Sequence, residues 1–411
     1  MSALGSLNTD VLPGLRILDF SHALAGPYAT MVLSDLGAEV LKVEHPGGGD
    51  RTRRFTDGEE NFSPYFGSVN RNKKSIVLDL KTPAGLELAL RLATKADVLV
   101  HNMGPGVADR LGLGYQQLCE QNQRLIYAVV TGFGLDGSWA LRRGVDPVIQ
   151  ALSGAMSFTG EPNGAPVRIG YSSVDVAGGM WLAMGVLAAV IERNQSGKGQ
   201  LLDISLLEAQ MAWMENAMVR YLDSGAIPQR MGSAHTYERL TRAYETRNGW
   251  MVVGVTARNW KKICAVWGRQ DWADDARFAD DALIANAESI APEIHKILRQ
   301  QDTEYWLEIL EAAGITCTPV NSIKEAVELP PLHERGFIAE TTDANGRKLR
   351  IAGSPLHLSR TPGRVRGAAP LLGQHGREAL ESWLELGDAE YRSYEEQGVF
   401  TPTDRSLRGF W

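Results

Sequence analysis

Short apolar segments alternate with helix-like segments over the first part of the chain, and this alternation limits the possible folds more than any other feature. Each apolar segment is short and rich in Leu, Ile and Val, as is typical of buried strands. Such segments cover residues 15–21, 39–44, 75–80, 97–102, 125–134 and 200–205. Helical patterns follow Pro27 as far as Asp35 and cover residues 82–95. This order predicts βαβ units and an α/β fold with a mainly parallel sheet.

The length of 411 residues exceeds what one hydrophobic core usually supports, so we expect more than one domain. Residues 1–224 are predicted to form a large Rossmann-like domain. Residues 225–329 are predicted to form a smaller α/β domain with strands near 250–255 and 315–320. Residues 330–411 hold one strand candidate and one helix, too little for an independent fold, and we expect them to return to the large domain.

A single carboxylate lies at the start of a long uncharged segment. Asp175 is the only charged residue between Arg168 and Glu192, and a helix is predicted from Val176 to Ile191. The uncharged run is shorter than the roughly 20 residues of a membrane span, which favours a helix buried in a large core. Asp175 could simply cap this helix. Alternatively, a carboxylate at the edge of a dry core loses hydration and becomes reactive.

The overall composition excludes several classes of function. A net charge of -7 argues against binding to nucleic acid or to an anionic membrane. Three widely spaced cysteines and scattered histidines predict no disulfide framework and no metal site, and they fit a reducing cytoplasm. The first residues show no targeting signal, so we expect a cytoplasmic protein.

Basic residues gather beside the predicted strand ends, although the whole chain is acidic. They are Arg51, Arg53, Arg54, Arg71, Lys73, Lys74, Arg110, Arg142 and Arg143. In open α/β sheets such loops can hold a phosphate, although solvated surface charge would give the same pattern. No GxGxxG fingerprint, P-loop or GxSxG elbow accompanies them. We therefore expect a nucleotide-containing ligand bound without those motifs, and Asp175 as the best nucleophile candidate.

Several blocks of sequence, in order, resemble the class III CoA-transferases of the CaiB/BaiF family. They are "LRILDFSHALAGPYATMVLSDLGAEVLKVEHPGGGD", "NRNKKSIVLDLKTPAG", "NMGPGVADRLGLGY", "YSSVDVAGG", "SGKGQLLDISLLEAQ", "GITCTPVNS" and "PLLGQH". The resemblance covers the chain from near Leu15 to about His375. It implies a Rossmann-like large domain built from both chain ends, a smaller domain, and two subunits interlocked as rings in a homodimer.

The resemblance also implies roles for individual residues. Asp175 matches the family's nucleophile. The residues expected to contact CoA are Arg110, Arg143, His45, Lys73, Lys74 and Met103. His45 stands where many relatives have an Arg beside the adenine. Leu24 stands where formyl-CoA transferases have Gln, which argues against formate or oxalate. His235 lies in a segment that is similar to the loop over the active site, where it could be catalytic or structural.

The implied reaction moves CoA from a donor such as succinyl-CoA to a free small carboxylic acid, with CoA as a substrate and no permanently bound cofactor. The resemblance is nearest to relatives acting on succinate or glutarate, and Arg53 or Arg54 could pair with the far carboxylate of such an acid. Two alternatives remain. A 2-methylacyl-CoA racemase would need a His where Val145 stands, and a non-catalytic CoA-binding protein would not need Asp175 as a nucleophile.

Overall fold

The computed structural model describes residues 10–56, 63–279 and 281–400. The chain forms two compact units. Unit 1 contains residues 1–153, 169–219 and 330–411, and unit 2 contains residues 154–168 and 220–329. The start of the chain at residues 1–9, where we expect no targeting signal, lies outside the described residues.

The boundary between the units differs from the predicted one at residue 224. Residues 154–168 belong to unit 2 because backbone contacts join them to a loop much later in the chain. The Gly232 N–H donates to the Gly160 carbonyl at 2.9 Å, and the Arg230 guanidinium donates to the Ser157 carbonyl at 3.0 Å. Such long-range contacts leave no periodic signal in the sequence.

Unit 1 is built on a six-stranded sheet in which every pair of neighbouring strands is parallel. Its strands are β1 (Arg16–Asp19), β2 (Glu39–Glu44), β3 (Lys74–Val77), β4 (Val98–His101), β5 (Ile126–Thr131) and β6 (Leu201–Ser205). The strand order is β3-β2-β1-β4-β5-β6, so the winding direction reverses between β1 and β4. The predicted α/β class with a parallel sheet is confirmed.

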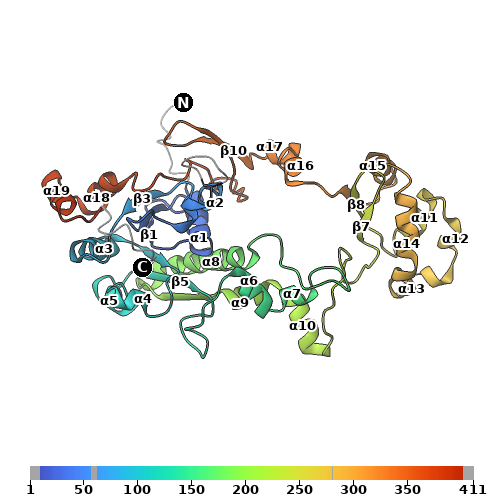
Figure 1. Cartoon of the computed structure of the whole chain (residues 1–411), viewed down its shortest axis with the longest axis horizontal. Coiled ribbons are helices and arrows are strands. Elements are labelled where there is room, and N and C mark those ends of the chain that lie inside the picture. Colours follow the sequence, from blue (N-terminus) through green and yellow to red (C-terminus); the bar gives the residue numbers. More distant parts are fainter. Residues whose placement is uncertain (1–9, 57–62, 280, 401–411) are drawn as a thin grey trace. The chain divides into compact units, whose positions relative to one another are not determined.

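Helices cover both faces of this sheet (Figure 1). Alternate strand residues pack against each helical layer. On one face Ile17 and Val100 pack with α1 (Ala25–Asp35) and α8 (Ser173–Ser196). On the other face Leu18 and Leu99 pack with α3 (Pro83–Lys95), α5 (Tyr115–Gln121) and α18 (Gly376–Leu384). Strands buried on both faces explain why the sequence shows continuous apolar runs instead of alternation.

Helix α8 is long and apolar enough to cross a membrane by length and composition alone. In the structure it packs against α1, β5 and β6 within unit 1. A Cβ at Gly179 would lie 2.6 Å from the Ala25 carbonyl oxygen, and one at Gly178 would lie 2.4 Å from the Leu206 side chain. The two glycines therefore allow the start of α8 to approach α1 and α9 (Leu206–Trp213) closely.

The C-terminal segment contributes directly to unit 1. It forms α17 (Pro330–Glu334), a hairpin of β10 (Ile338–Thr342) and β11 (Lys348–Ala352), then α18 and α19 (Asp388–Glu396). Leu380 and Trp383 of α18 complete the core beside β3 and α3. The remaining short helices of unit 1 are α2 (Pro64–Val69), α4 (Val107–Arg110), α6 (Asp146–Leu152) and the 3₁₀ helix η1 (Arg51–Arg54).

Unit 2 has its own core around a three-stranded antiparallel sheet. The strands are β7 (Arg242–Glu245), β8 (Trp250–Val253) and β9 (Cys317–Pro319). The helices are α7 (Ala155–Phe158), α11 (Trp260–Val266), α12 (Gln270–Ala273), α13 (Asp281–Ala285), α14 (Ala287–Leu298), α15 (Thr303–Ala312) and α16 (Ile323–Val327), with η2 (Ala276–Phe278) between α12 and α13. Strand β7 was not predicted, because Tyr244 is its only fully buried residue. Helix α10 (Glu215–Ser224) spans the boundary between the two units.

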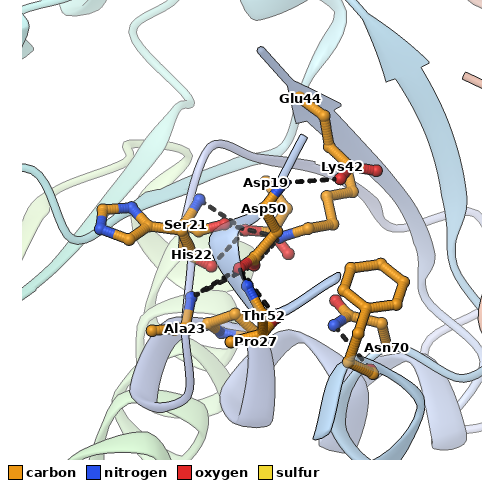
Figure 2. A network of polar contacts seen from close by, with 12 residues as sticks. Asp19, Ser21, His22, Ala23, Pro27, Lys42, Glu44, Asp50, Thr52 and Asn70 are labelled. Carbon is orange, nitrogen blue, oxygen red and sulfur yellow. Dashed lines mark hydrogen bonds and ion pairs between the residues drawn. The ribbon is translucent and has the colours of Figure 1, made fainter. Parts of the chain in front are cut away.

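A buried network of charged side chains joins the ends of β1, β2 and β3 (Figure 2). The Lys73 ammonium donates to Asp19 at 3.2 Å, to the Pro27 carbonyl at 2.9 Å and to Asn70 at 2.9 Å. Burial raises the pKa of Asp19, but Lys73, Lys42 and the hydroxyl groups of Ser21 and Thr30 together lower it more, and the net value is about 2. Lys73 was expected to contact CoA, but all three of its donors are used inside the core, so this assignment is wrong.

We expect Lys73→Met to lower the free energy of unfolding by about 3 kcal/mol or more, because it leaves the Asp19 carboxylate buried without its partner. Lys74→Met is the matched control. Lys74 pairs with Glu39 and Glu378 at a partly exposed site, so its loss costs about 1 kcal/mol or less. Urea titration of both variants measures the difference, and equal losses would contradict the structural role of Lys73.

Candidate functional site

A cavity of about 210 Å³ opens at the carboxyl edge of the sheet in unit 1. Its walls come from the loops after β1 and β4, the end of β5, and the first turn of α8. The residues that line it are His22, Ala23, Leu24, Ala25, Arg51, Asn102, Val130, Thr131, Gly132, Gly144, Val145, Asp146, Asp175 and Leu206. In parallel α/β sheets, ligands bind at this edge where the strand order reverses, which here is between β1 and β4.

Asp175 is the half-buried third residue of α8. Burial, and after it the charge of the neighbouring Asp146, raise the pKa of its carboxyl, while Arg51 lowers it, and the net value is about 6. Within the part of the chain that the structure describes, no donor hydrogen-bonds to this carboxylate. The carboxylate is therefore poorly solvated and available for reaction. A carboxylate that served only as a helix cap would instead accept hydrogen bonds from the helix N–H groups.

Asp146 supplies the cap that the sequence analysis considered for Asp175. It is the first residue of α6, and one of its oxygens accepts the Val174 N–H at 3.0 Å. The other accepts from the Gln150 side chain at 2.8 Å, whose own oxygen accepts the Ile169 N–H at 2.9 Å. Because Asp146 satisfies a free N–H of the first turn of α8, Asp175 is left for another role.

Two loops that carry cavity residues are held in fixed positions. The His22 N–H donates to the Asn102 side chain at 3.0 Å, and the Asn102 amide donates back to the His22 carbonyl at 2.7 Å. Ala23 has a φ of +65°, which is unusual for a residue with a Cβ, and its N–H donates to Asp50 (Figure 2). Burial lowers the pKa of His22 to about 4, so its imidazole is neutral at pH 7.

The residues expected to contact CoA lie in different environments. Arg110 ends α4 and is exposed, and Arg143 is exposed next to Gly144 of the cavity wall. Met103 is buried directly after Asn102, and its N–H donates to His101. His45 is half-buried after the last residue of β2, where it accepts the Gly47 N–H at 2.8 Å. Lys74 pairs with Glu39 and Glu378, so it is already occupied.

The residues expected to bind the acceptor acid are less available than the sequence indicated. The Arg53 guanidinium contacts both oxygens of Glu44 at 2.7 Å and the Pro370 carbonyl at 3.1 Å. It cannot also form a bidentate pair with a substrate, so this assignment of Arg53 is wrong. Arg54 is exposed and donates to the Gly47 carbonyl at 2.7 Å. His235 belongs to unit 2, where its ring accepts the Glu238 N–H at 3.2 Å.

Comparison with known proteins identifies the family of this chain. The family model described as CoA-transferase family III matches residues 12–376. The chain belongs to CoA-transferase family III.

Relatives of known activity and a solved structure cover nearly the whole chain. A succinyl-CoA:glutarate CoA-transferase of Mus musculus is 35% identical over 380 residues, which are 92% of this chain and 87% of that protein. A succinate–glutarate CoA-transferase of Agrobacterium fabrum is 35% identical, over 90% of this chain and 94% of that one. The crystal structure of a CaiB/BaiF family protein from Brucella suis has a TM-score of 0.84 at 31% identity, with 91% and 99% of the two chains covered. The protein is an enzyme that transfers CoA.

Sequence reasoning missed three features of this candidate site. Asp146 lies in the "GVD" block, which drew attention only to Val145, although an Asp before Pro147 is itself a helix-start signal. Arg51 was one of three neighbouring arginines, and nothing in the sequence distinguished it from Arg53. Asn102 gave no signal of its own. Among the described residues, no cluster of His, Cys, Asp or Glu could hold a metal ion.

We expect Asp146→Asn to move the pKa of Asp175 from about 6 towards its ordinary lower value, because it removes a negative charge that raises this pKa. Water-soluble carbodiimide labels protonated carboxyl groups, so the pH midpoint for labelling Asp175, located by mass spectrometry, should fall. Asp136→Asn makes the same chemical change at an exposed position and should leave the midpoint unchanged. An unchanged midpoint in Asp146→Asn would contradict the electrostatic coupling.

Proposed function

We propose that this enzyme moves CoA from succinyl-CoA or a similar donor to a free small dicarboxylic acid, through covalent intermediates on Asp175. The observation that carries the proposal is the Asp175 carboxylate at the wall of a cavity on the carboxyl edge of the sheet. It accepts no hydrogen bond from the residues that the structure describes, and its pKa is raised to about 6. The mouse and bacterial relatives named above act on succinate and glutarate, which supports the choice of acid.

The first half of the reaction loads CoA onto the enzyme. A carboxylate oxygen of Asp175 attacks the carbonyl carbon of the donor, the C–S bond breaks, and CoA leaves as a thiolate. The thiolate then attacks the aspartyl carbonyl of the mixed anhydride and displaces the donor acid as a free carboxylate. The product is an aspartyl-CoA thioester.

The second half returns the enzyme to its starting state. The acceptor carboxylate attacks the carbonyl carbon of the aspartyl thioester, and the C–S bond breaks to release the CoA thiolate. The acceptor and Asp175 are then joined in a second mixed anhydride. The thiolate attacks the acceptor's acyl carbon, acyl-CoA leaves, and the Asp175 carboxylate is restored. Each step exchanges one activated acyl group for another, so the balance requires no ATP and no net proton transfer.

The environment of Asp175 suits this cycle. A pKa of about 6 leaves the group ionised at pH 7, and its loss of hydration favours attack on a carbonyl. The N-terminal end of α8 stabilises the anion. In the proposal, Arg110 and Arg143 contact the CoA phosphates, while His45 and Met103 line the path of the nucleotide. Val145 lines the cavity and cannot accept a proton, which disfavours the racemase alternative.

Asp175→Asn should lower transfer from succinyl-CoA to glutarate by at least about a thousandfold, roughly 4 kcal/mol of barrier, because the amide cannot attack. Wild-type enzyme treated with succinyl-CoA and hydroxylamine should be modified at Asp175, as located by mass spectrometry. Glu192→Gln alters an exposed carboxylate elsewhere on the same helix and should keep full activity. Normal turnover by folded Asp175→Asn would rule out the proposed nucleophile.

We also propose that the enzyme is a cytoplasmic homodimer with interlocked subunits. Large apolar side chains are exposed in unit 1, and they include Met180, Trp181 and Met184 of α8 and Trp213 of α9. Exposed apolar groups on neighbouring helices are typical of a surface that another chain covers. Cys119, Cys264 and Cys317 are free thiols, which a reducing cytoplasm would preserve.

An interlocked dimer should not dissociate on dilution, because its subunits share apolar surface and chain topology. Mass photometry at nanomolar concentration should show particles of twice the 44.9 kDa chain mass. Trp181→Glu together with Met184→Glu should reduce the yield of this dimer. Monomers of the wild-type chain at that concentration would contradict the assignment.

A further inference from the structure

Arg51 lines the same cavity as Asp175, and its charge is close enough to lower the pKa of that carboxyl. It is the first residue of η1, between β2 and α2. Arg51 is exposed, whereas Lys42 and Lys73 are buried. The cavity therefore places a nucleophile and a guanidinium on walls that come from distant parts of the chain.

The backbone under Arg51 is rigidly held. Asp50 caps η1 by accepting the Thr52 N–H at 3.0 Å and the Thr52 hydroxyl at 2.8 Å. Lys42 lies 3.3 Å from Asp50, and the Asp50 N–H donates to Glu44 at 3.0 Å (Figure 2). A guanidinium on such a support can receive a ligand without reorganising its own loop.

Neighbouring cations are paired with carboxylates inside the protein, whereas Arg51 has no such pair within residues 10–56, 63–279 and 281–400. Lys42 pairs with Asp50, Arg53 with Glu44 and Lys73 with Asp19. Among the residues that the structure describes, Arg51 forms no ion pair and no hydrogen bond through its side chain. Its five N–H donors are thus available to a carboxylate, and a guanidinium binds carboxylates in bidentate fashion.

The charge of the cavity changes during the proposed reaction, and the change favours binding of a carboxylate by Arg51. Of the described lining residues, Asp175 and Asp146 are acidic and Arg51 is basic, while His22 is neutral. Acylation of Asp175 removes one negative charge, and Asp146 is occupied by the Val174 N–H and Gln150. The guanidinium then faces a cavity that an anionic acid can enter.

We propose that Arg51 binds the non-reacting carboxylate of the acceptor acid and so selects dicarboxylic over monocarboxylic acids. This inference rests on the proposed function. A guanidinium bound to the attacking carboxylate would stabilise the charge that is consumed on attack, and this would slow the reaction. A guanidinium bound to the far carboxylate retains its full interaction in the transition state. Arg53, which the sequence suggested for this role, is paired with Glu44. We therefore assign the role to Arg51.

The test separates loading of the enzyme from acid recognition. Wild type, Arg51→Gln, Arg51→Lys and Arg91→Gln are each incubated with succinyl-CoA until intact mass spectrometry shows the CoA adduct. The adduct is freed of small molecules and mixed with glutarate or with pentanoate, which has the same chain length and a single carboxylate. The rate of acyl-CoA formation in a single turnover is measured against acid concentration. Arg91 is the control because it pairs with Glu390 on the opposite helical layer.

Arg51→Gln should weaken the apparent affinity for glutarate at least about 30-fold, equivalent to about 2 kcal/mol, and change that for pentanoate less than about threefold. Arg51→Lys should recover part of the loss, because it keeps the charge but not the bidentate geometry. Arg91→Gln should behave as wild type with both acids. Equal losses for the two acids, no loss in Arg51→Gln, or a wild type that accepts pentanoate as readily as glutarate would overturn the inference. Failure of wild type to form any CoA adduct would instead overturn the proposed function.

Discussion

The pairing of buried charges beneath the carboxyl edge of the sheet is the interaction on which the site depends. Lys73 and Lys42 lie among Asp19, Asp50 and Glu44, and these groups join the loops that follow β1 and β2. Removing one partner would leave an uncompensated charge in the core, which costs several kcal/mol. The network therefore fixes the two loops in one arrangement. It also holds Ala23 in its strained conformation through Asp50. The same network therefore contributes to the stability of the fold and determines the shape of the cavity.

Asp175 is available because the neighbouring carboxylate, Asp146, makes the hydrogen bonds at the start of α8. Both lie close to the first turn of α8, but Asp146 accepts the N–H of Val174 and is hydrogen-bonded by Gln150. Asp175 forms no such contacts within the described residues, and burial together with the charge of Asp146 raises its pKa to about 6. Asp146 therefore holds the start of α8, whereas Asp175 is available for the proposed role as nucleophile. This pattern of neighbouring carboxyl groups in different environments is common in enzymes that need one of them as a nucleophile.

The parallel sheet could be predicted from the sequence because buried strands require continuous apolar runs, and all six runs became strands. The nucleophile candidate was also visible, since a lone Asp before an uncharged segment stands out. The partners of charged side chains were not visible. "NRNKKS" and "DRTRR" look like exposed basic loops, yet Lys73 and Arg53 are paired with Asp19 and Glu44. These pairs join residues 54 and nine positions apart, and no local pattern encodes whether a cation faces inward or outward.

The arrangement of cations explains how an acidic protein can hold an anionic substrate. Lys42, Arg53 and Lys73 neutralise internal carboxylates, so these three cations add no net attraction for a ligand. Arg51 differs because Asp50, directly before it in the chain, is neutralised from below by Lys42 and by the N–H groups of Ala23 and Thr52. The negative charge nearest to Arg51 in sequence is thereby screened from its guanidinium. Arg51 then remains as a cation in the same cavity as Asp175, whose own charge would be lost in the proposed acylation. In the proposed cycle, the same side chain therefore favours ionised Asp175 in one half and the incoming acid in the other.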